Sequence, residues 1–102
     1  MQRRGDLVFE VVSRLGRRIR LSRSHWEYIV RVKHPSVEGL EKDVETALKS
    51  PVEVRRSSKD PSVFLYYGKF GDKLICALPK HLNEEGFVIT AYLTRRVGGD
   101  PI

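Results

Sequence analysis

The fold is decided by the stretch SVFLYYGKFGDKLICALPKHLNEEGFVITAYLT, residues 62–94. Its apolar, aromatic and β-branched residues recur with a period near two, which is typical of strands. The predicted strands span residues 62–68, 73–79 and 86–94. Glycine, aspartate and asparagine fill the short connections between them, and these residues favour turns. Because short connections favour antiparallel neighbours, the stretch predicts an antiparallel meander.

One further strand and two helices precede this meander. The sequence VEVRRSS, residues 52–58, predicts a fourth strand. Ser24 and Glu27 have the spacing of a capping box, which predicts a first helix that ends before Pro35. A second helix is predicted to start after Ser36, with apolar residues at spacings of three and four. Those apolar residues are Val37, Leu40, Val44, Ala47 and Leu48.

The amino-terminal part predicts a hairpin, with strands at residues 6–13 and 16–22 and a turn near Gly16. The chain of 102 residues fits a single domain. We therefore expect an α+β fold in which two N-terminal helices pack on one face of a four-stranded antiparallel sheet. The hairpin is an optional addition to that sheet. Its other face is expected to be open.

Charge and cysteine content restrict the partners. The chain has 19 Lys and Arg against 13 Asp and Glu, a net charge of +6, which attracts nucleic acid, acidic proteins or anionic surfaces. A generally basic protein without such a partner is the alternative. Cys76 is the only cysteine and is expected to be a small buried hydrophobe. No apolar run approaches the length of a membrane span and the start is not a secretory signal, so we expect no membrane partner and a cytoplasmic location.

The last predicted strand has two different sides. Ile89, Ala91 and Leu93 form the core side, and Val88, Thr90, Tyr92 and Thr94 form the other. Alternation in the preceding strands adds Arg55 and either Tyr66 or Tyr67 to this polar face. Cations neutralise phosphates and aromatic rings stack on bases, so the face is a candidate nucleic-acid surface. The alternative is an ordinary solvated sheet face, because Thr and Tyr are good strand residues.

His25 is the first catalytic candidate. It follows Ser24 in the first turn of the predicted helix, where the helix dipole disfavours a protonated imidazole. A neutral imidazole can take a proton from a ribose 2′-hydroxyl, which is the first step of metal-independent RNA cleavage. The alternative is a surface or boundary histidine with no catalytic role.

The other histidines have less specific contexts. His34 precedes Pro35 at the end of the first helix, where it is either a general acid or a helix-terminating residue. His81 lies in a turn and is expected to be a loop residue. No pair of histidines or acids has a metal-binding spacing, so neither a metal nor another cofactor is expected. Phosphate-binding loops and nucleophile elbows are also missing from the sequence.

The order of these motifs resembles small nuclease-like domains of the barnase–EndoU–colicin–RelE superfamily, in its poorly characterised phage and prokaryotic branches. Three stretches carry the resemblance: LSRSHWEYIVRVKHPSVEGLEKDVETALKSPVEV, FLYYGKFGDKLICALPK and GFVITAYLTRR. It covers residues 19–97 and leaves residues 1–18 as a basic strand or arm and residues 98–102 as a tail. The resemblance implies a metal-independent endoribonuclease of the kind used as a toxin or in conflicts between phages and mobile elements.

The resemblance also suggests roles for individual residues. His25, Thr90 and Tyr92 become the catalytic candidates. The nucleic-acid-binding candidates are Tyr66, Lys69 and Thr94, to which position adds Arg55, Lys80 and Arg95. RNA is the expected partner, and an acidic antitoxin or immunity-type protein is a further one. The alternatives are a non-catalytic nucleic-acid-binding module and a protein-interaction domain.

Overall fold

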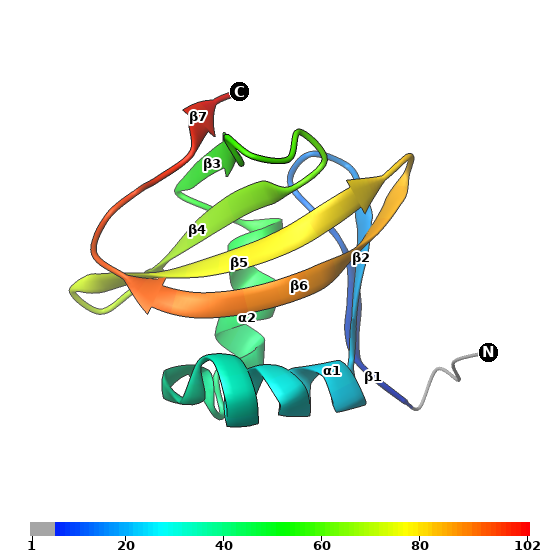
Figure 1. Cartoon of the computed structure of the whole chain (residues 1–102), viewed down its shortest axis with the longest axis vertical. Helices are drawn as coiled ribbons and strands as arrows, with labels where there is room; N and C mark the ends of the chain where they lie inside the picture. The colour runs from blue at the N-terminus through cyan, green and yellow to red at the C-terminus, as the bar shows by residue number, and fades with distance from the viewer. Residues whose placement is uncertain (1–5) are drawn as a thin grey trace.

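A seven-stranded mixed sheet organises the molecule (Figure 1). The computed structural model describes residues 6–102. The strands are β1 (Leu7–Val12), β2 (Arg18–Ser22), β3 (Glu53–Arg56), β4 (Phe64–Phe70), β5 (Lys73–Leu82), β6 (Glu85–Thr94) and β7 (Asp100–Pro101). The helical elements are α1 (Arg23–Tyr28), the π-helical turn η2 (Ile29–Lys33), the 3₁₀ turn η3 (Pro35–Val37) and α2 (Glu41–Lys49). The strand order is β1-β2-β6-β5-β4-β3-β7.

The prediction of a four-stranded antiparallel sheet is wrong. Strands β3 to β6 do form an antiparallel meander, but the hairpin β1–β2 extends the sheet at one edge and β7 extends it at the other. Strand β2 pairs in parallel with β6, through residues 18–20 and 85–87. The long connection through both helices permits this parallel pairing, which local periodicity cannot indicate.

The two helices do not pack side by side on one face, which also differs from the prediction. Helix α2 lies across β4 and β5, on what we call the inner face of the sheet. Helix α1 and the turns after it lie along the edge of β6 and the end of the β1–β2 hairpin. Because β2 pairs with only the first part of β6, the rest of that edge is left for the helical segment to cover.

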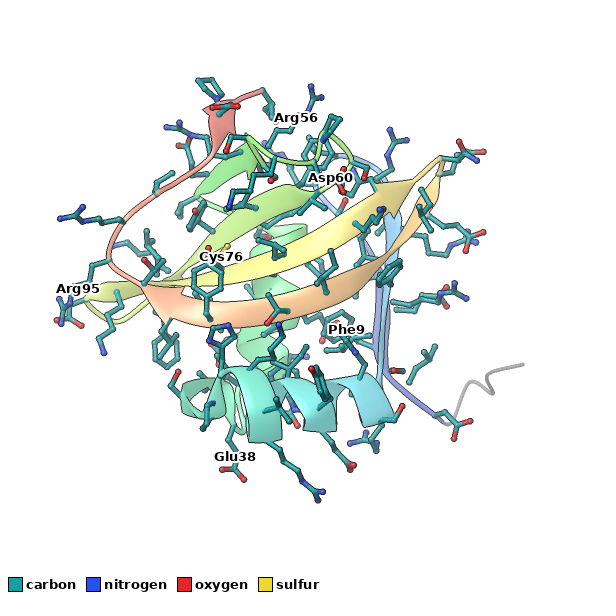
Figure 2. All side chains as sticks on the ribbon, viewed as in Figure 1. Phe9, Glu38, Arg56, Asp60, Cys76 and Arg95 are labelled. Carbon is teal, nitrogen blue, oxygen red and sulfur yellow. The ribbon has the colours of Figure 1, made fainter. Side chains whose placement is uncertain are left out.

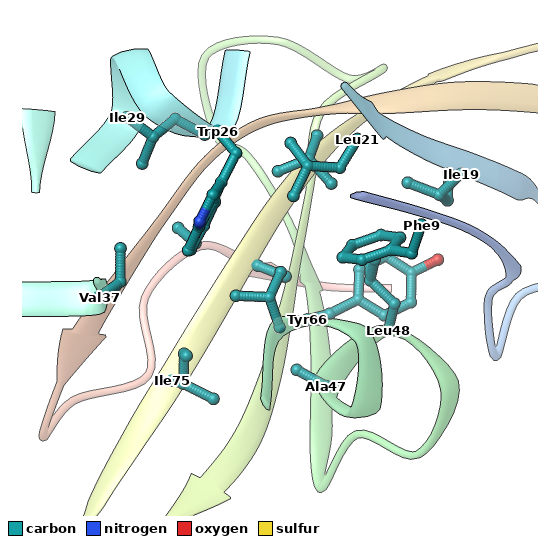
Figure 3. Close-up of a cluster of buried hydrophobic side chains, with 14 of the residues drawn as sticks. Phe9, Ile19, Leu21, Trp26, Ile29, Val37, Ala47, Leu48, Tyr66 and Ile75 are labelled. Atoms are coloured by element: carbon teal, nitrogen blue, oxygen red, sulfur yellow. The ribbon is translucent and has the colours of Figure 1, made fainter. Parts of the chain in front are cut away.

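The main core fills the space between the inner face, α1 and α2 (Figure 3). Trp26 and Ile29 enter it from the helical segment, and Ile19 and Leu21 enter it from β2. Further members include Phe9, Val37, Val44, Ala47, Leu48, Phe64, Tyr66, Ile75, Ala77, Val88 and Ala91. The alternating burial of β2 is therefore the reason why the added hairpin belongs to the domain.

Both helices start at different residues from those predicted. Ser22, not Ser24, caps α1, because its side-chain oxygen accepts a hydrogen bond from the His25 backbone N–H at 3.2 Å. Helix α2 begins at Glu41, after a separate 3₁₀ turn. Gly39 interrupts the predicted continuous helix, since its φ of +81° lies in the left-handed region.

A β-bulge in β6 changes the expected sides of that strand. Leu78 pairs with Thr90, whereas the next residue, Pro79, pairs with Val88, so Ile89 is the extra residue. Val88 is consequently buried in the main core with Ala91, although strict alternation places it on the polar side. Beyond the bulge, Thr90, Tyr92 and Thr94 remain on the side opposite the core.

The face of the sheet opposite α2, here called the outer face, is not fully open. It carries a second buried cluster of Leu65, Tyr67 and Cys76, bordered by Leu74, Leu78 and Tyr92. The carboxyl-terminal segment, residues 95–102, runs from the end of β6 to the edge of β3, where β7 pairs. The Gly98 N–H donates to the Tyr67 hydroxyl at 2.8 Å, and Tyr67 is only 1% exposed. This segment thus covers the part of the outer face formed by β3 and β4.

Candidate functional site

Sheet pairing brings six of the predicted site residues onto the outer face: Arg55, Lys69, Lys80, Thr90, Tyr92 and Thr94 (Figure 2). Its paired rows are Lys69–Leu74–Thr94, Tyr67–Cys76–Tyr92, Arg55–Leu65 and Leu78–Thr90. Adjacent strands lie about 4.8 Å apart, so neighbouring members of a row are in side-chain contact range. Figure 2 shows this face toward the viewer, with Cys76 near its middle and Arg95 where β6 ends.

His25 lies at the edge of this face and is held against the backbone of β6. Its ring Nε2 is 2.7 Å from the carbonyl oxygen of Ile89, the extra residue of the bulge. A carbonyl oxygen only accepts hydrogen bonds, so Nε2 carries a proton. In the neutral ring Nδ1 is then the nitrogen that can accept a proton. The bulge therefore fixes the orientation and the tautomer of the candidate base.

His34, which follows the helical turn η2, lies against Tyr92. Tyr92 is three residues beyond Ile89 in β6. The ring centroids of His34 and Tyr92 are 5.5 Å apart, with an interplanar angle of 40°. At about 3.3 Å per residue, Ile89 and Tyr92 are about 10 Å apart along β6. The helical segment thus places both of its histidines beside the part of β6 that carries Thr90 and Tyr92.

Thr90 has an unusual environment for a residue on this face. Its Oγ1 is buried and has no hydrogen-bond partner in the described part of the chain. A buried hydroxyl without a partner costs about 1–3 kcal/mol, so such groups are rare unless they have a further role. Thr90 is therefore not an ordinary solvated strand residue. His25 contacts the backbone of Ile89, and no direct hydrogen bond joins it to the neighbouring Thr90.

The row Tyr67–Cys76–Tyr92 keeps its side-chain protons at neutral pH. Burial raises the pKa of Tyr92, and the nearby Cys76 and Tyr67 raise it further. Burial also raises the pKa of Tyr67, and it raises that of the Cys76 thiol to about 11. The two phenols can act as hydrogen-bond donors but not as bases. Cys76 is fully buried, which confirms the prediction of a small buried hydrophobe.

Tyr66 does not belong to this face. It is fully buried on the inner face, where its hydroxyl lies 2.9 Å from Ser13 Oγ and 3.1 Å from His81 Nε2. Tyr67, its neighbour in sequence, takes the outer-face position instead. His81, expected in a loop, is a buried member of β5 that stacks on Phe64.

Most of the predicted cations already have carboxylate partners. Arg55 Nε lies 2.6 Å from Glu53 Oε2, beside the carboxyl-terminal segment. Lys80 pairs with Asp60 at 3.5 Å, and Arg95 pairs with Asp72 at 3.3 Å. The Arg95 pair is exposed on both sides and contributes little to stability. Lys69 is exposed and makes no ion pair within residues 6–102, which leaves it free to meet a phosphate.

Four hollows in the surface lie away from His25, His34 and the part of β6 beside them. One hollow of about 260 Å³ is lined by residues of α1 and the α1–α2 connection, including Trp26, Arg31 and Glu38. Another, of about 300 Å³, lies beside the β1–β2 turn and includes Arg18 and Glu84. Neither of these hollows includes His25 or Tyr92, and the same is true of two more, beside residues 82–86 and beside Asp6 and Arg23.

Residues 6–102 show neither a metal-binding cluster nor a membrane-spanning helix. No group of three or more His, Cys, Asp or Glu side chains in this range is placed to hold a metal ion. Among the same residues, no helix has both the length and the apolar character needed to cross a bilayer.

Comparisons of the chain with protein-family models, with curated proteins and with solved structures found no match.

Proposed function

We propose that this protein is a metal-independent endoribonuclease that cleaves RNA along the β6 side of the outer face. The observation that carries the proposal is the 2.7 Å hydrogen bond from His25 Nε2 to the Ile89 carbonyl oxygen. It leaves Nδ1 as the ring nitrogen that can accept a proton, and it holds the ring against the backbone next to Thr90. The net charge of +6 supports a polyanionic substrate.

The reaction needs two proton transfers and no metal in principle. His25 Nδ1 takes the proton of a ribose 2′-hydroxyl, and the 2′-oxygen attacks the adjacent phosphorus. The bond from phosphorus to the 5′-oxygen breaks, and protonated His34 gives that oxygen a proton. The products are a 2′,3′-cyclic phosphate and a 5′-hydroxyl. The separation of the two histidines along β6 suits groups on opposite sides of one phosphate.

Hydroxyl donors and a cation stabilise the charge on the phosphoryl oxygens in this proposal. Tyr92 stays protonated because burial raises its pKa, whereas the Thr90 hydroxyl is buried and must become accessible before it can donate to RNA. Fixed donors of this kind stabilise a transition state more than they stabilise the substrate. Lys69 and Thr94 share the row at the end of β6 and bind the adjacent phosphate.

The test is incubation of the purified protein with RNA in the presence of EDTA, followed by analysis of the RNA ends. Products with 2′,3′-cyclic phosphate ends are expected. His25→Ala and His34→Ala should each lower the rate about 100-fold or more, because general acid–base catalysis contributes that much. A bell-shaped dependence of the rate on pH should become one-sided in either variant.

Ser24→Ala is the matched control for the histidine variants. Ser24 is exposed, neighbours His25 in α1 and does not cap the helix. This variant should keep the wild-type rate. Cleavage that survives in a protein carrying both His25→Ala and Tyr92→Phe would show that the proposed site is wrong.

The net charge of +6 and the exposed Lys69 also suit a second candidate, a non-catalytic nucleic-acid-binding module on the same face. It predicts salt-sensitive binding of RNA without turnover and no effect of His25→Ala on that binding. The net charge also suits an acidic protein partner, which would co-purify with the chain. For either RNA-directed function we propose a cytoplasmic location, where RNA substrates are accessible.

A further inference from the structure

The outer face carries a second group of residues suited to RNA, on the other side of the bulge from Tyr92. Register places Arg20 of β2 beside Phe87 of β6, and Phe87 opposite Lys80 of β5. All three point away from the main core, because their neighbours Ile19, Val88 and Pro79 are buried. An aromatic ring therefore lies between two cations across three adjacent strands. We call these three residues the Phe87 row.

Burial in a core does not explain why a phenylalanine stands at position 87. Phe87 is 41% exposed, whereas Tyr67 and Cys76 elsewhere on the outer face are at most 1% exposed. An exposed aromatic ring on a sheet, with cations on both sides, suits a base that stacks on the ring and phosphates that meet the cations. The carboxyl-terminal segment contacts Tyr67, Leu65 and the β3 backbone. It therefore covers the β3–β4 side of the outer face and leaves the Phe87 row uncovered.

The cations of the row are held only by weak partners. Arg20 lies 3.8 Å from Glu85, with side chains 47% and 55% exposed. Lys80 lies 3.5 Å from Asp60, with side chains 37% and 44% exposed. Exposed ion pairs of this kind contribute little and are screened by salt, so a phosphate can displace the carboxylate.

We propose that the Phe87 row is a nucleobase-binding subsite that selects single-stranded RNA. Phe87 stacks on an unpaired base, and Arg20 and Lys80 bind the flanking phosphates. Phe87 is two residues from Ile89, or about 7 Å along β6, so the stacked base lies next to the carbonyl that orients His25. A paired base cannot lie flat on a sheet residue without leaving its duplex, which gives the preference for single strands. This inference rests on the proposed function for the identity of the polymer.

The experiment measures binding of a fluorescent 2′-O-methyl RNA by anisotropy, as a single strand and as a duplex of the same sequence. This probe lacks the attacking hydroxyl, so binding is measured without cleavage. Phe87→Ala and Phe87→Leu should each weaken single-strand binding about tenfold, because both remove the stacking ring. Phe87→Tyr keeps an aromatic ring and should bind the single strand as tightly as the wild-type protein does. Arg20→Gln and Lys80→Gln should each reduce the salt dependence of log K by about 0.7.

Two further variants sharpen the test. Glu85→Gln should strengthen binding, because it releases Arg20 from its competing carboxylate. Val12→Ala is the matched control, since Val12 is also an exposed strand residue but lies on β1, away from the row, and should have no effect. Circular dichroism confirms that each variant is folded.

The possible failures are distinguishable. Wild-type affinity in both Phe87→Ala and Phe87→Leu, equal binding of duplex and single strand, or no binding by the wild-type protein overturns the subsite. Loss of binding in Phe87→Ala together with a wild-type protein that never cleaves RNA supports the subsite and rejects the nuclease proposal instead.

Discussion

Tyr66 and Tyr67 are neighbours in sequence, yet they organise opposite faces of the sheet. Both are almost fully buried, and both have a hydrogen-bonded hydroxyl. The Tyr66 hydroxyl joins two other buried side chains, Ser13 from the β1–β2 turn and His81 from β5. The Tyr67 hydroxyl receives instead a backbone N–H from Gly98, an exposed residue of the carboxyl-terminal segment.

The two hydroxyls differ in how easily their partners can be replaced. The inner cluster of Tyr66, Ser13 and His81 connects elements that are far apart in the chain and cannot exchange its partners for water without unfolding. The outer cluster is covered by a segment whose terminal strand pairs through only two residues. The inner face therefore fixes the fold, while the outer face can vary in how much of it is covered.

Tyr66→Phe is expected to have the largest effect. It leaves His81, 8% exposed, without the Tyr66 hydroxyl, and it leaves Ser13 Oγ, 5% exposed, with the Arg17 backbone N–H at 3.2 Å as its described partner. An unsatisfied buried group costs about 1–3 kcal/mol and a lost hydrogen bond about 1 kcal/mol, so the free energy of unfolding should fall by about 2–4 kcal/mol. Urea unfolding monitored by Trp26 fluorescence measures this. A loss below about 1 kcal/mol would mean that the inner network is not structural.

Acid should weaken the inner cluster by a smaller amount. Burial, together with the positive charges of Arg17 and Arg56, lowers the pKa of His81 from 6.5 to about 4. The unfolded chain therefore binds a proton that the folded chain does not bind between pH 6.5 and pH 4. Stability is fully present above pH 6.5 and decreases by about 2–3 kcal/mol as the pH falls to 4.

The control for this pH effect is the difference between wild type and His81→Gln. Urea unfolding of both proteins at several pH values removes the contributions that they share, including those of His25 and His34. The difference should shrink as the pH falls from 6.5 to 4. A difference that stays constant over this range would contradict a buried neutral His81.

The sequence predicts the individual strands well and their assembly poorly. Alternation along residues 62–94 is a local property, and β4, β5 and β6 form where it indicates. The parallel pairing of β2 with β6 and the docking of β7 on β3 join residues far apart in the chain. No local period specifies such contacts, because they depend on which edges remain uncovered after the meander forms.

The candidate site was predictable only as a set of positions. Alternation correctly separates Thr90 and Tyr92 from Ala91, but a single extra residue, Ile89, reverses it for Val88. The two adjacent tyrosines fit either face until the pairing of β4 is known. Lys80 was predicted as a nucleic-acid contact, but Arg20 and Phe87 were missed because the three residues lie on three strands, two of which meet only through the parallel pairing.

Gly99→Ala tests how firmly the outer face is covered. Gly99 has a φ of +80°, and an added Cβ would lie 2.8 Å from the Arg56 carbonyl oxygen. This conflict should cost about 1–2 kcal/mol and release the carboxyl-terminal segment without unfolding the sheet. Trypsin cleavage after the exposed Arg95 and Arg96 should then be about 5–30 times faster.

Gly98→Ala is the matched control for that variant. A Cβ at Gly98 would meet only the Tyr67 hydroxyl, at an ordinary 3.7 Å, and its backbone is not in the left-handed region. Its cleavage rate should match that of the wild type. Equal acceleration in the two variants would attribute the effect to loss of glycine flexibility rather than to the close contact at Gly99.

Tyr67→Phe should have the smallest effect, although it removes the same atom as Tyr66→Phe from a residue that is equally buried. The Gly98 N–H loses its acceptor, but Gly98 is exposed, so water can replace the hydroxyl there. The Tyr92 and Cys76 side chains beside the hydroxyl keep their contact with each other. The free energy of unfolding should therefore fall by less than about 1 kcal/mol. Hydrogen exchange at the Gly98 amide should become faster, because its protecting acceptor is gone. A loss as large as that of Tyr66→Phe would contradict the distinction between the two faces, since the outer cluster would then stabilise the whole fold.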